Sequence, residues 1–144
     1  MAKTVLVSAC LLGVNCRFDA TARSNPELLK KLRDCAVVPV CPEQLGGLPT
    51  PRSPAEITGG DGHDVLDGRA KVVNEQGEDV TSNYVRGARE VLTLAKLFGA
   101  NRAYLKSKSP ACGCGRIKRC GKTVEGDGVC AALLKRHDIQ VIEV

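Results

Sequence analysis

The chain is poor in aromatic side chains and has no long hydrophobic run. It contains two Tyr, two Phe and no Trp. Proteins that bind single-stranded nucleic acid stack successive bases on aromatic rings, so the composition argues against such a platform. No apolar run approaches the roughly 20 residues that a membrane span needs. The first ten residues hold one Lys before a very short apolar run, which is typical of a strand and not of a secretory signal. We therefore expect a cytoplasmic protein.

Cysteine is abundant, but the spacing typical of thiol redox proteins is missing. Eight of the 144 residues are Cys. Without a secretory signal, this number favours metal binding or catalysis over a disulfide framework. No two cysteines have Cys-x-x-Cys spacing, which weakens the alternative of a thiol redox protein that uses two of the eight. Some cysteines can simply fill the core, and we expect this of Cys35 and Cys130.

One stretch of the chain lacks acidic residues altogether. Residues 102–122 contain seven Lys or Arg, no Asp or Glu, and three of the cysteines. A basic neighbourhood stabilises thiolates and attracts anionic ligands. The simpler alternative is a solvated basic face. The net charge of the whole chain is only +5.

The hydrophobic pattern predicts strands that alternate with helices. The predicted strands are residues 4–9, 36–40, 102–106 and 140–144, and the predicted helices are residues 27–34, 81–98 and 129–136. Asn25 and Pro26 open the first helix, and Gly99 ends the second. This order predicts an α/β fold, as a single three-layer domain over residues 1–144. We expect a mainly parallel sheet with helices on both faces.

Two segments interrupt the alternation. Residues 44–80 are rich in Pro and Gly and contain Glu75-Gln76-Gly77, which predicts a small β-hairpin between residues 69 and 80. This segment is too short to be a second domain, and we interpret it as an insertion that could cover a site. Residues 107–128 are predicted to form a long Gly-, Cys- and Lys-rich loop.

Three cysteines, Cys10, Cys41 and Cys112, each follow a predicted strand. Ligands of open parallel sheets bind outside the carboxyl ends of the strands, so we expect the three thiols to share one edge of the sheet. Three thiolates can bind a metal and leave one coordination position open, and such soft ligands suit zinc, copper(I) or an iron–sulfur cluster. Spacing alone does not separate these metals. A local zinc knuckle of Cys112, Cys114 and Cys120 is an alternative, in which Cys114 could also replace Cys112 as a ligand.

Several short motifs occur in order along nearly the whole chain. They are Val7-Ser8-Ala9-Cys10-Leu11-Leu12-Gly13, Cys16-Arg17, Cys41-Pro42-Glu43, Pro54-Ala55-Glu56-Ile57, Gly59-Gly60-Asp61-Gly62, Asp67-Gly68, Asp79-Val80-Thr81, Lys106-Ser107-Lys108-Ser109-Pro110-Ala111-Cys112-Gly113 and Gly126-Asp127-Gly128-Val129. In these motifs the sequence resembles the 2-thiouracil desulfidase family.

The resemblance implies a [4Fe-4S] cluster held by Cys10, Cys41 and Cys112. It implies a non-redox reaction in which water replaces the sulfur of a thiolated pyrimidine and hydrosulfide is released. A carboxylate and a serine of the family move protons. The carboxylate corresponds to Glu43 and the serine to Ser107 or Ser109. A structural alternative remains for each, because a Glu after Cys-Pro can accept backbone donors and a Ser before Pro110 is an ordinary turn residue.

The residues after Cys16 differ from the family pattern. Phe18-Asp19-Ala20 stands where the family has Tyr-Asp-Gly, which affects the expected choice of substrate. The candidate substrate-binding residues are Ser8, Asn15, Arg17 and Asp19. Ser8 could instead bond to cluster sulfur.

The basic run suggests what kind of substrate the site takes. It could hold a nucleotide phosphate and so favour a thiouridine monophosphate over the free base. A tRNA substrate is possible but less favoured, and the alternative function is a non-enzymatic zinc module that contacts nucleic acid. The sequence leaves open whether the protein is a monomer or a homodimer.

Overall fold

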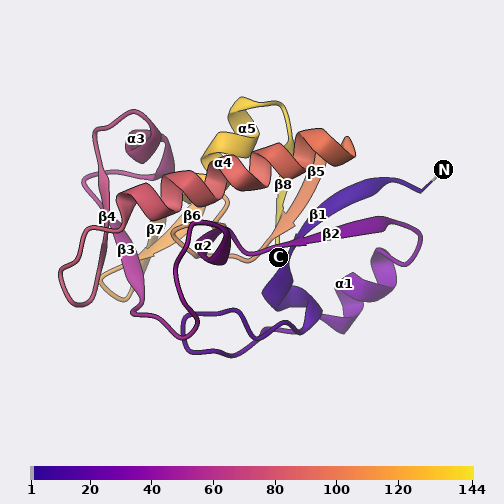
Figure 1. The fold of residues 1–144 in the computed structure, drawn as a ribbon, viewed down its shortest axis with the longest axis horizontal. Helices are drawn as coiled ribbons and strands as arrows, with labels where there is room; N and C mark the ends of the chain where they lie inside the picture. Colours follow the sequence, from indigo (N-terminus) through magenta and orange to yellow (C-terminus); the bar gives the residue numbers. More distant parts are fainter. Residues whose placement is uncertain (1) are drawn as a thin grey trace.

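A four-stranded parallel sheet forms the centre of the computed structural model, which describes residues 2–144 (Figure 1). In spatial order the strands are β2 (Ala36–Val40), β1 (Thr4–Ser8), β5 (Arg102–Leu105) and β8 (Gln140–Glu143). All neighbouring pairs are parallel. Strand β1 thus lies between β2, which follows it in sequence, and β5, which comes much later. Open α/β sheets bind their ligands at such a reversal of strand order.

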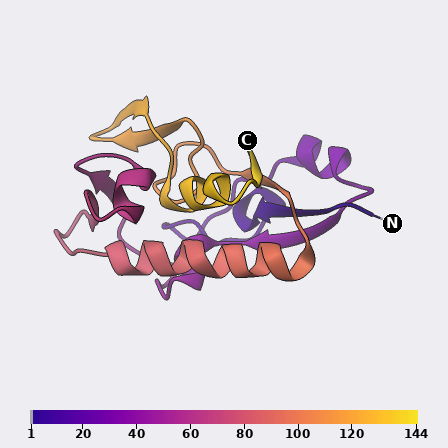
Figure 2. The ribbon, with the colours of Figure 1, turned by 90° about the horizontal axis from the view of Figure 1, so that it is seen from above.

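Helices cover both faces of this sheet. On one face, α1 (Pro26–Lys31) and the residue after it place Leu28 and Leu32 in a core with Val5, Val7 and Tyr104. On the other face, α4 (Thr81–Phe98) and α5 (Val129–Arg136) pack in a larger core that includes residues of β1 and β5. Figure 2 shows α1 and α4 on opposite sides of the sheet. The predicted α/β class, with a mainly parallel sheet and helices on both faces, is confirmed.

The segment predicted as a hairpin insertion is more regular than expected. It follows α2 (Pro42–Leu45) and contains β3 (Ala55–Thr58), α3 (Gly62–Leu66) and β4 (Lys71–Asn74). The predicted pairing is present in short form, with the bridge Val73–Asp79 and backbone hydrogen bonds that join Asn74 to Glu78 and Val80 to Val72. Strand β4 pairs mainly with β3, which was not predicted. The reason is that the proline run ends at Pro54, so the next residues are free to form a strand and bury Ile57 beside Val72.

The segment predicted as a long loop also contains a hairpin. Strands β6 (Arg116–Arg119) and β7 (Lys122–Glu125) pair in antiparallel fashion. Their turn places Cys120 and Gly121 at φ of 51° and 75°, the positive values that two-residue hairpin turns need. The prediction missed the hairpin because Cys is unusual at such a position and because only Ile117 of β6 is apolar and buried.

Within residues 2–144, no helix is both long and apolar enough to cross a membrane.

Candidate functional site

A cavity of about 980 Å³ opens at the carboxyl ends of β1, β2 and β5. Of the residues that the sequence predicts for a site, those that line the cavity are Ser8, Cys10, Arg17, Cys41, Glu43, Ser107, Ser109 and Cys112. Two predicted substrate residues lie outside this lining. Asn15 is exposed, and the exposed Asp19 accepts hydrogen bonds from the backbone and hydroxyl of Thr21. The cavity thus brings together residues that are up to 104 positions apart in sequence.

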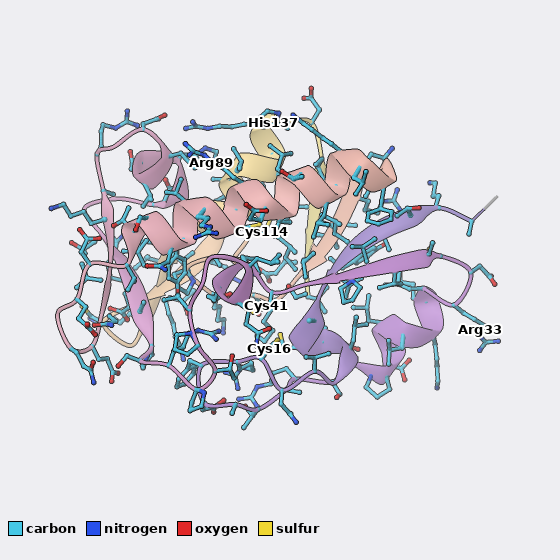
Figure 3. The ribbon with its side chains drawn as sticks, viewed as in Figure 1. Cys16, Arg33, Cys41, Arg89, Cys114 and His137 are labelled. Atoms are coloured by element: carbon cyan, nitrogen blue, oxygen red, sulfur yellow. The ribbon has the colours of Figure 1, made fainter. Side chains whose placement is uncertain are left out.

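Cys10 and Cys41 are positioned by the ends of neighbouring strands. Cys10 lies in the short helical turn Ala9–Leu12 directly after β1, and Cys41 caps the amino end of α2 directly after β2. Between them lies a fourth cysteine, Cys16, which is 2% exposed. It lines the same cavity as Cys10 and Cys41. Figure 3 shows Cys16 and Cys41 close together, and Cys41 Sγ lies 3.8 Å from the Cys16 carbonyl oxygen.

The pKa values of Cys10 and Cys41 are shifted in opposite directions. The neighbouring Cys16 thiol is the main cause that lowers the pKa of Cys10. The same thiol, together with burial and the charge of Glu43, raises the pKa of Cys41. Sequence reasoning placed Cys16 in a motif but gave it no role.

Cys112 reaches the same cavity from the segment after β5. The Ser8 hydroxyl donates to Cys112 Sγ at 3.5 Å and accepts from the Lys106 backbone N–H at 2.9 Å. Ser8 therefore connects the end of β1 to the third cysteine. Burial is the main cause that raises the pKa of Cys112, followed by the charge of Glu43.

Glu43 lies in the first turn of α2 and faces the sulfur atoms. Its Oε1 is 3.8 Å from Cys41 Sγ, and its Oε2 is 3.9 Å from Nη2 of Arg52. Both side chains are nearly buried, at 13% and 7% exposure. Sequence reasoning missed Arg52. The available signal was a single basic residue among the prolines of residues 49–54.

The two candidate serines have different surroundings. Ser109 Oγ accepts hydrogen bonds from the backbone N–H groups of Ala111 and Cys112, at 3.0 and 2.9 Å. Its oxygen thus forms the turn that presents Cys112, while its hydroxyl hydrogen stays available to the cavity. Ser107 Oγ instead lies 3.2 Å from Nζ of Lys106.

The local zinc knuckle does not form. Cys112 faces the cavity, Cys114 Sγ lies 3.7 Å from the carbonyl oxygen of Val141, and Cys120 is exposed at the turn between β6 and β7. Across residues 2–144, no three His, Cys, Asp or Glu side chains converge as the ligands of a single metal ion do. Cys130 is fully buried, as expected of a core residue, and Cys35 is half-buried against the smaller core.

The donors around the cavity fit an iron–sulfur cluster. Iron–sulfur clusters are held by cysteine thiolates, each on its own iron atom, so the thiols need not converge on one point. Here Cys10, Cys41 and Cys112 approach one open cavity from three strand ends. The thiols of Cys41 and Cys112 resist ionisation in the protein alone. A bound metal centre supplies the positive charge that deprotonates such thiols.

Positive charge surrounds the rest of the cavity. The basic residues that line it are Arg17, Arg23, Arg52, Lys106, Lys108 and Lys118. Three lining residues, Glu43, Glu56 and Glu75, are acidic. This balance favours an anionic ligand.

Comparisons with known proteins concern the chain as a whole. A family model described as 2-thiouracil desulfurase matches residues 5–144. A solved structure of TudS, a [4Fe-4S]-dependent thiouracil desulfidase, aligns with a TM-score of 0.83 at 39% identity, over 98% of this chain and 90% of that one. The uncharacterized protein YbbK of Bacillus subtilis is 46% identical over 141 residues, which are 96% of this chain and 93% of YbbK.

Proposed function

The chain belongs to the 2-thiouracil desulfurase family, and from that premise we propose that it is a [4Fe-4S]-dependent enzyme that desulfurates a thiolated pyrimidine. The reaction converts a thiocarbonyl and water into a carbonyl and hydrosulfide, with no net change of oxidation state. The observation that carries the proposal is the placement of three thiols, from three separate strand ends, around one open cavity.

Cys10, Cys41 and Cys112 would hold the cluster. With three protein ligands for four iron atoms, the cluster supplies one iron that can act as a Lewis acid toward a thiocarbonyl sulfur. The hydrogen bond from Ser8 to Cys112 orients the third ligand. The protein must supply everything else that the reaction needs, which is a positioned water and a path for protons.

Glu43 is the proposed general base. Its carboxylate lies beside Cys41 and lines the cavity, so a water that it binds is held next to the cluster. General bases act within hydrogen-bond reach of the proton that they remove. Glu43 would take a proton from that water as the water attacks the thiocarbonyl carbon.

Ser109 is the better placed of the two serines to donate a proton. Its oxygen already accepts two backbone hydrogen bonds, which leaves the O–H as a donor toward a ring nitrogen or the departing sulfur. Ser107 contacts the Lys106 ammonium group and would serve to position that charge. Replacing Ser109 with Ala should therefore slow turnover more than the same change at Ser107.

The basic lining supports a substrate that carries phosphate. Among residues 2–144, one of the six basic residues that line the cavity, Arg52, forms an ion pair with a carboxylate of the same lining. The other five do not. We expect a thiouridine monophosphate to have a KM at least about tenfold below that of the free thiobase at low salt, a difference that added salt reduces. Equal KM values for the two substrates would contradict this preference. A small nucleotide also suits the size of the cavity better than tRNA.

The cluster assignment is tested by protein reconstituted with iron and sulfide in the absence of oxygen. The expected protein is brown and consumes the thiocarbonyl absorbance of 2- or 4-thiouracil compounds. Cys10→Ser, Cys41→Ser and Cys112→Ser should each lose the visible absorbance and the activity together, whereas Cys35→Ser should keep both. A colourless protein that binds stoichiometric zinc would exclude the proposal and favour a zinc module. The thiols need reducing conditions to bind a cluster, which fits the cytoplasm as the proposed location.

A further inference from the structure

We propose that Arg52 is the positioning residue of this site, holding the Glu43 carboxylate and the Cys16 segment in one arrangement. The inference rests on the proposed function, in which Glu43 activates water. Arg52 lies outside the secondary structure, between α2 and β3, yet its side chain is only 7% exposed. A nearly buried guanidinium needs both acceptors and a compensating charge.

The acceptors of Arg52 come from its surroundings and not from Glu43. Nη1 donates to the Pro49 carbonyl and the Thr50 hydroxyl, both at 3.2 Å, and Nη2 donates to the Cys16 carbonyl at 3.0 Å. These three bonds fix the plane of the guanidinium, which presents its donors in a rigid fork. The charge is thus held in place before any substrate binds.

The compensating charge is Glu43. The distance of 3.9 Å from Nη2 to Oε2 is an ion pair but is too long for a direct hydrogen bond. Among residues 2–144, neither Arg52 nor Glu43 forms an ion pair with any other residue. Arg52 therefore orients the carboxylate by charge. Oε1 faces Cys41 Sγ, while Oε2 accepts no hydrogen bond from residues 2–144 and can bind water. Partners that orient the ligands of a metal site are typically worth about 10–100-fold in affinity or activity, and we expect an effect of similar size behind the proposed base.

Arg52 also holds the segment that carries Cys16. Its backbone N–H donates to the Phe18 carbonyl at 2.8 Å, in addition to the bond from Nη2 to the Cys16 carbonyl. Cys41 Sγ in turn lies 3.8 Å from the Cys16 carbonyl oxygen, and Cys16 lines the same cavity as Cys10. One residue thus connects the rim of the cavity to the proposed base and to the neighbour of two proposed ligands.

The test is a double-mutant cycle on the anaerobically loaded full chain. Arg52→Gln and Arg52→Lys are each made with Glu43 present and in the Glu43→Gln background. Arg69→Gln is the control, because Arg69 is 63% exposed and pairs with Asp64 and Asp67. The readouts are iron per chain, melting temperature, kcat and KM for 2-thiouracil, and hydrogen exchange of peptides that cover residues 14–20 and 42–46.

We expect Arg52→Gln to keep its iron and to lower kcat by about 10–100-fold with little change in KM. Arg52→Lys should recover part of that loss because it keeps the charge. In the Glu43→Gln background the further loss should be under about twofold, since the two residues act as a unit. Equal losses in both backgrounds, a change in KM alone, or a loss of iron would overturn the proposal.

Hydrogen exchange tests the positioning role of Arg52 independently of turnover. Exchange in both peptides should rise at least several-fold in Arg52→Gln and stay unchanged in Arg69→Gln, because protection depends on local hydrogen bonds. Unchanged protection in Arg52→Gln would overturn the positioning role. Failure of the proposed function would give a different result. The loaded wild-type protein would leave thiouracil unconverted, while the difference in hydrogen exchange between Arg52→Gln and the wild type would persist.

Discussion

At the scale of single residues, the proposed chemistry depends on one carboxylate beside one sulfur atom. We expect Glu43→Gln to lower kcat by at least about 100-fold, the ordinary contribution of a general base. The cluster content should not change, because Gln has nearly the same shape and Glu43 is not a proposed ligand. Iron analysis, visible absorbance and steady-state kinetics on the same preparation measure these effects.

Glu75→Gln provides the matched control for this substitution. Glu75 also lines the cavity, but it follows β4 and lies in the insertion. Its variant should keep kcat within about twofold, since most substitutions away from the reacting groups have small effects. A Glu43→Gln enzyme that turns over like the wild type would assign the activation of water to another group.

The residues of the site differ in how far sequence could predict them. Cys10, Cys41 and Cys112 were predicted to share an edge because each follows a strand, and they do line one cavity. Cys16 and Arg52 could not be given roles in this way. Their contacts depend on how two loops fold back onto each other, which no local pattern encodes.

At the scale of elements, the position of α2 controls both Cys41 and Glu43. Helix α4 fixes α2 by close approach, since a Cβ on Gly87 would lie 1.9 Å from the carbonyl oxygen of Pro42. On the other side of the contact, a Cβ on Gly46 would lie 2.0 Å from the carbonyl oxygen of Asn83. Two glycines therefore let the backbones of the two helices touch.

Gly87→Ala should push α2 away from α4. The change ordinarily stabilises a helix by about 1 kcal/mol, so any net loss measures the clash. We expect the free energy of unfolding to fall by about 1–3 kcal/mol, as in other overpacked cores, and the cluster content to fall with it. Urea unfolding and iron analysis measure the two effects. Thr93→Ala, at an exposed position of α4, should lose neither stability nor cluster content. A Gly87→Ala protein with normal stability would show that α2 is free to move.

Elements with strong hydrophobic periodicity were predicted well, and elements without it were not. Helices α4 and α5 and the four strands of the central sheet lie within one or two residues of their predicted bounds. Helix α1 ends earlier than predicted, at Lys31. The missed elements, α2, α3, β3, β6 and β7, are short, and most of their residues are exposed or half-buried. Tertiary contacts define such elements, and a single sequence carries little trace of those contacts.

At the scale of the whole molecule, one buried carboxylate joins the insertion to the segment that presents Cys112. Asp127 accepts hydrogen bonds from the Gly115 backbone, from Lys135 of α5 and from His63 of α3, at 2.8, 2.8 and 3.0 Å. Its own backbone N–H donates to Asp61 at 3.2 Å. Three parts of the chain that are far apart in sequence therefore meet at one side chain.

These contacts give Asp127 a predictable effect on stability. Burial acts to raise the pKa of Asp127, but the bonds from Lys135, Gly115 and His63 outweigh it and hold the pKa below its ordinary value. A carboxyl with a lowered pKa in the folded state stabilises the protein above its unfolded pKa of about 4. That stabilisation is lost as the pH falls through the lower, folded value.

Asp127→Asn should therefore lower the free energy of unfolding at pH 7 by about 1–3 kcal/mol, the cost of weakening hydrogen bonds to charged partners. The difference from the wild type should shrink as the pH falls below about 4, because the wild-type carboxyl then takes up its own proton, first in the unfolded chain and at lower pH in the folded protein. Urea unfolding followed by circular dichroism, on cluster-free protein in reductant, measures both trends. The exposed Asp34→Asn variant should follow the wild type throughout. A difference that stays constant with pH would mean that Asp127 stabilises the fold by its shape alone, and that its charge does not hold the insertion against the segment carrying Cys112.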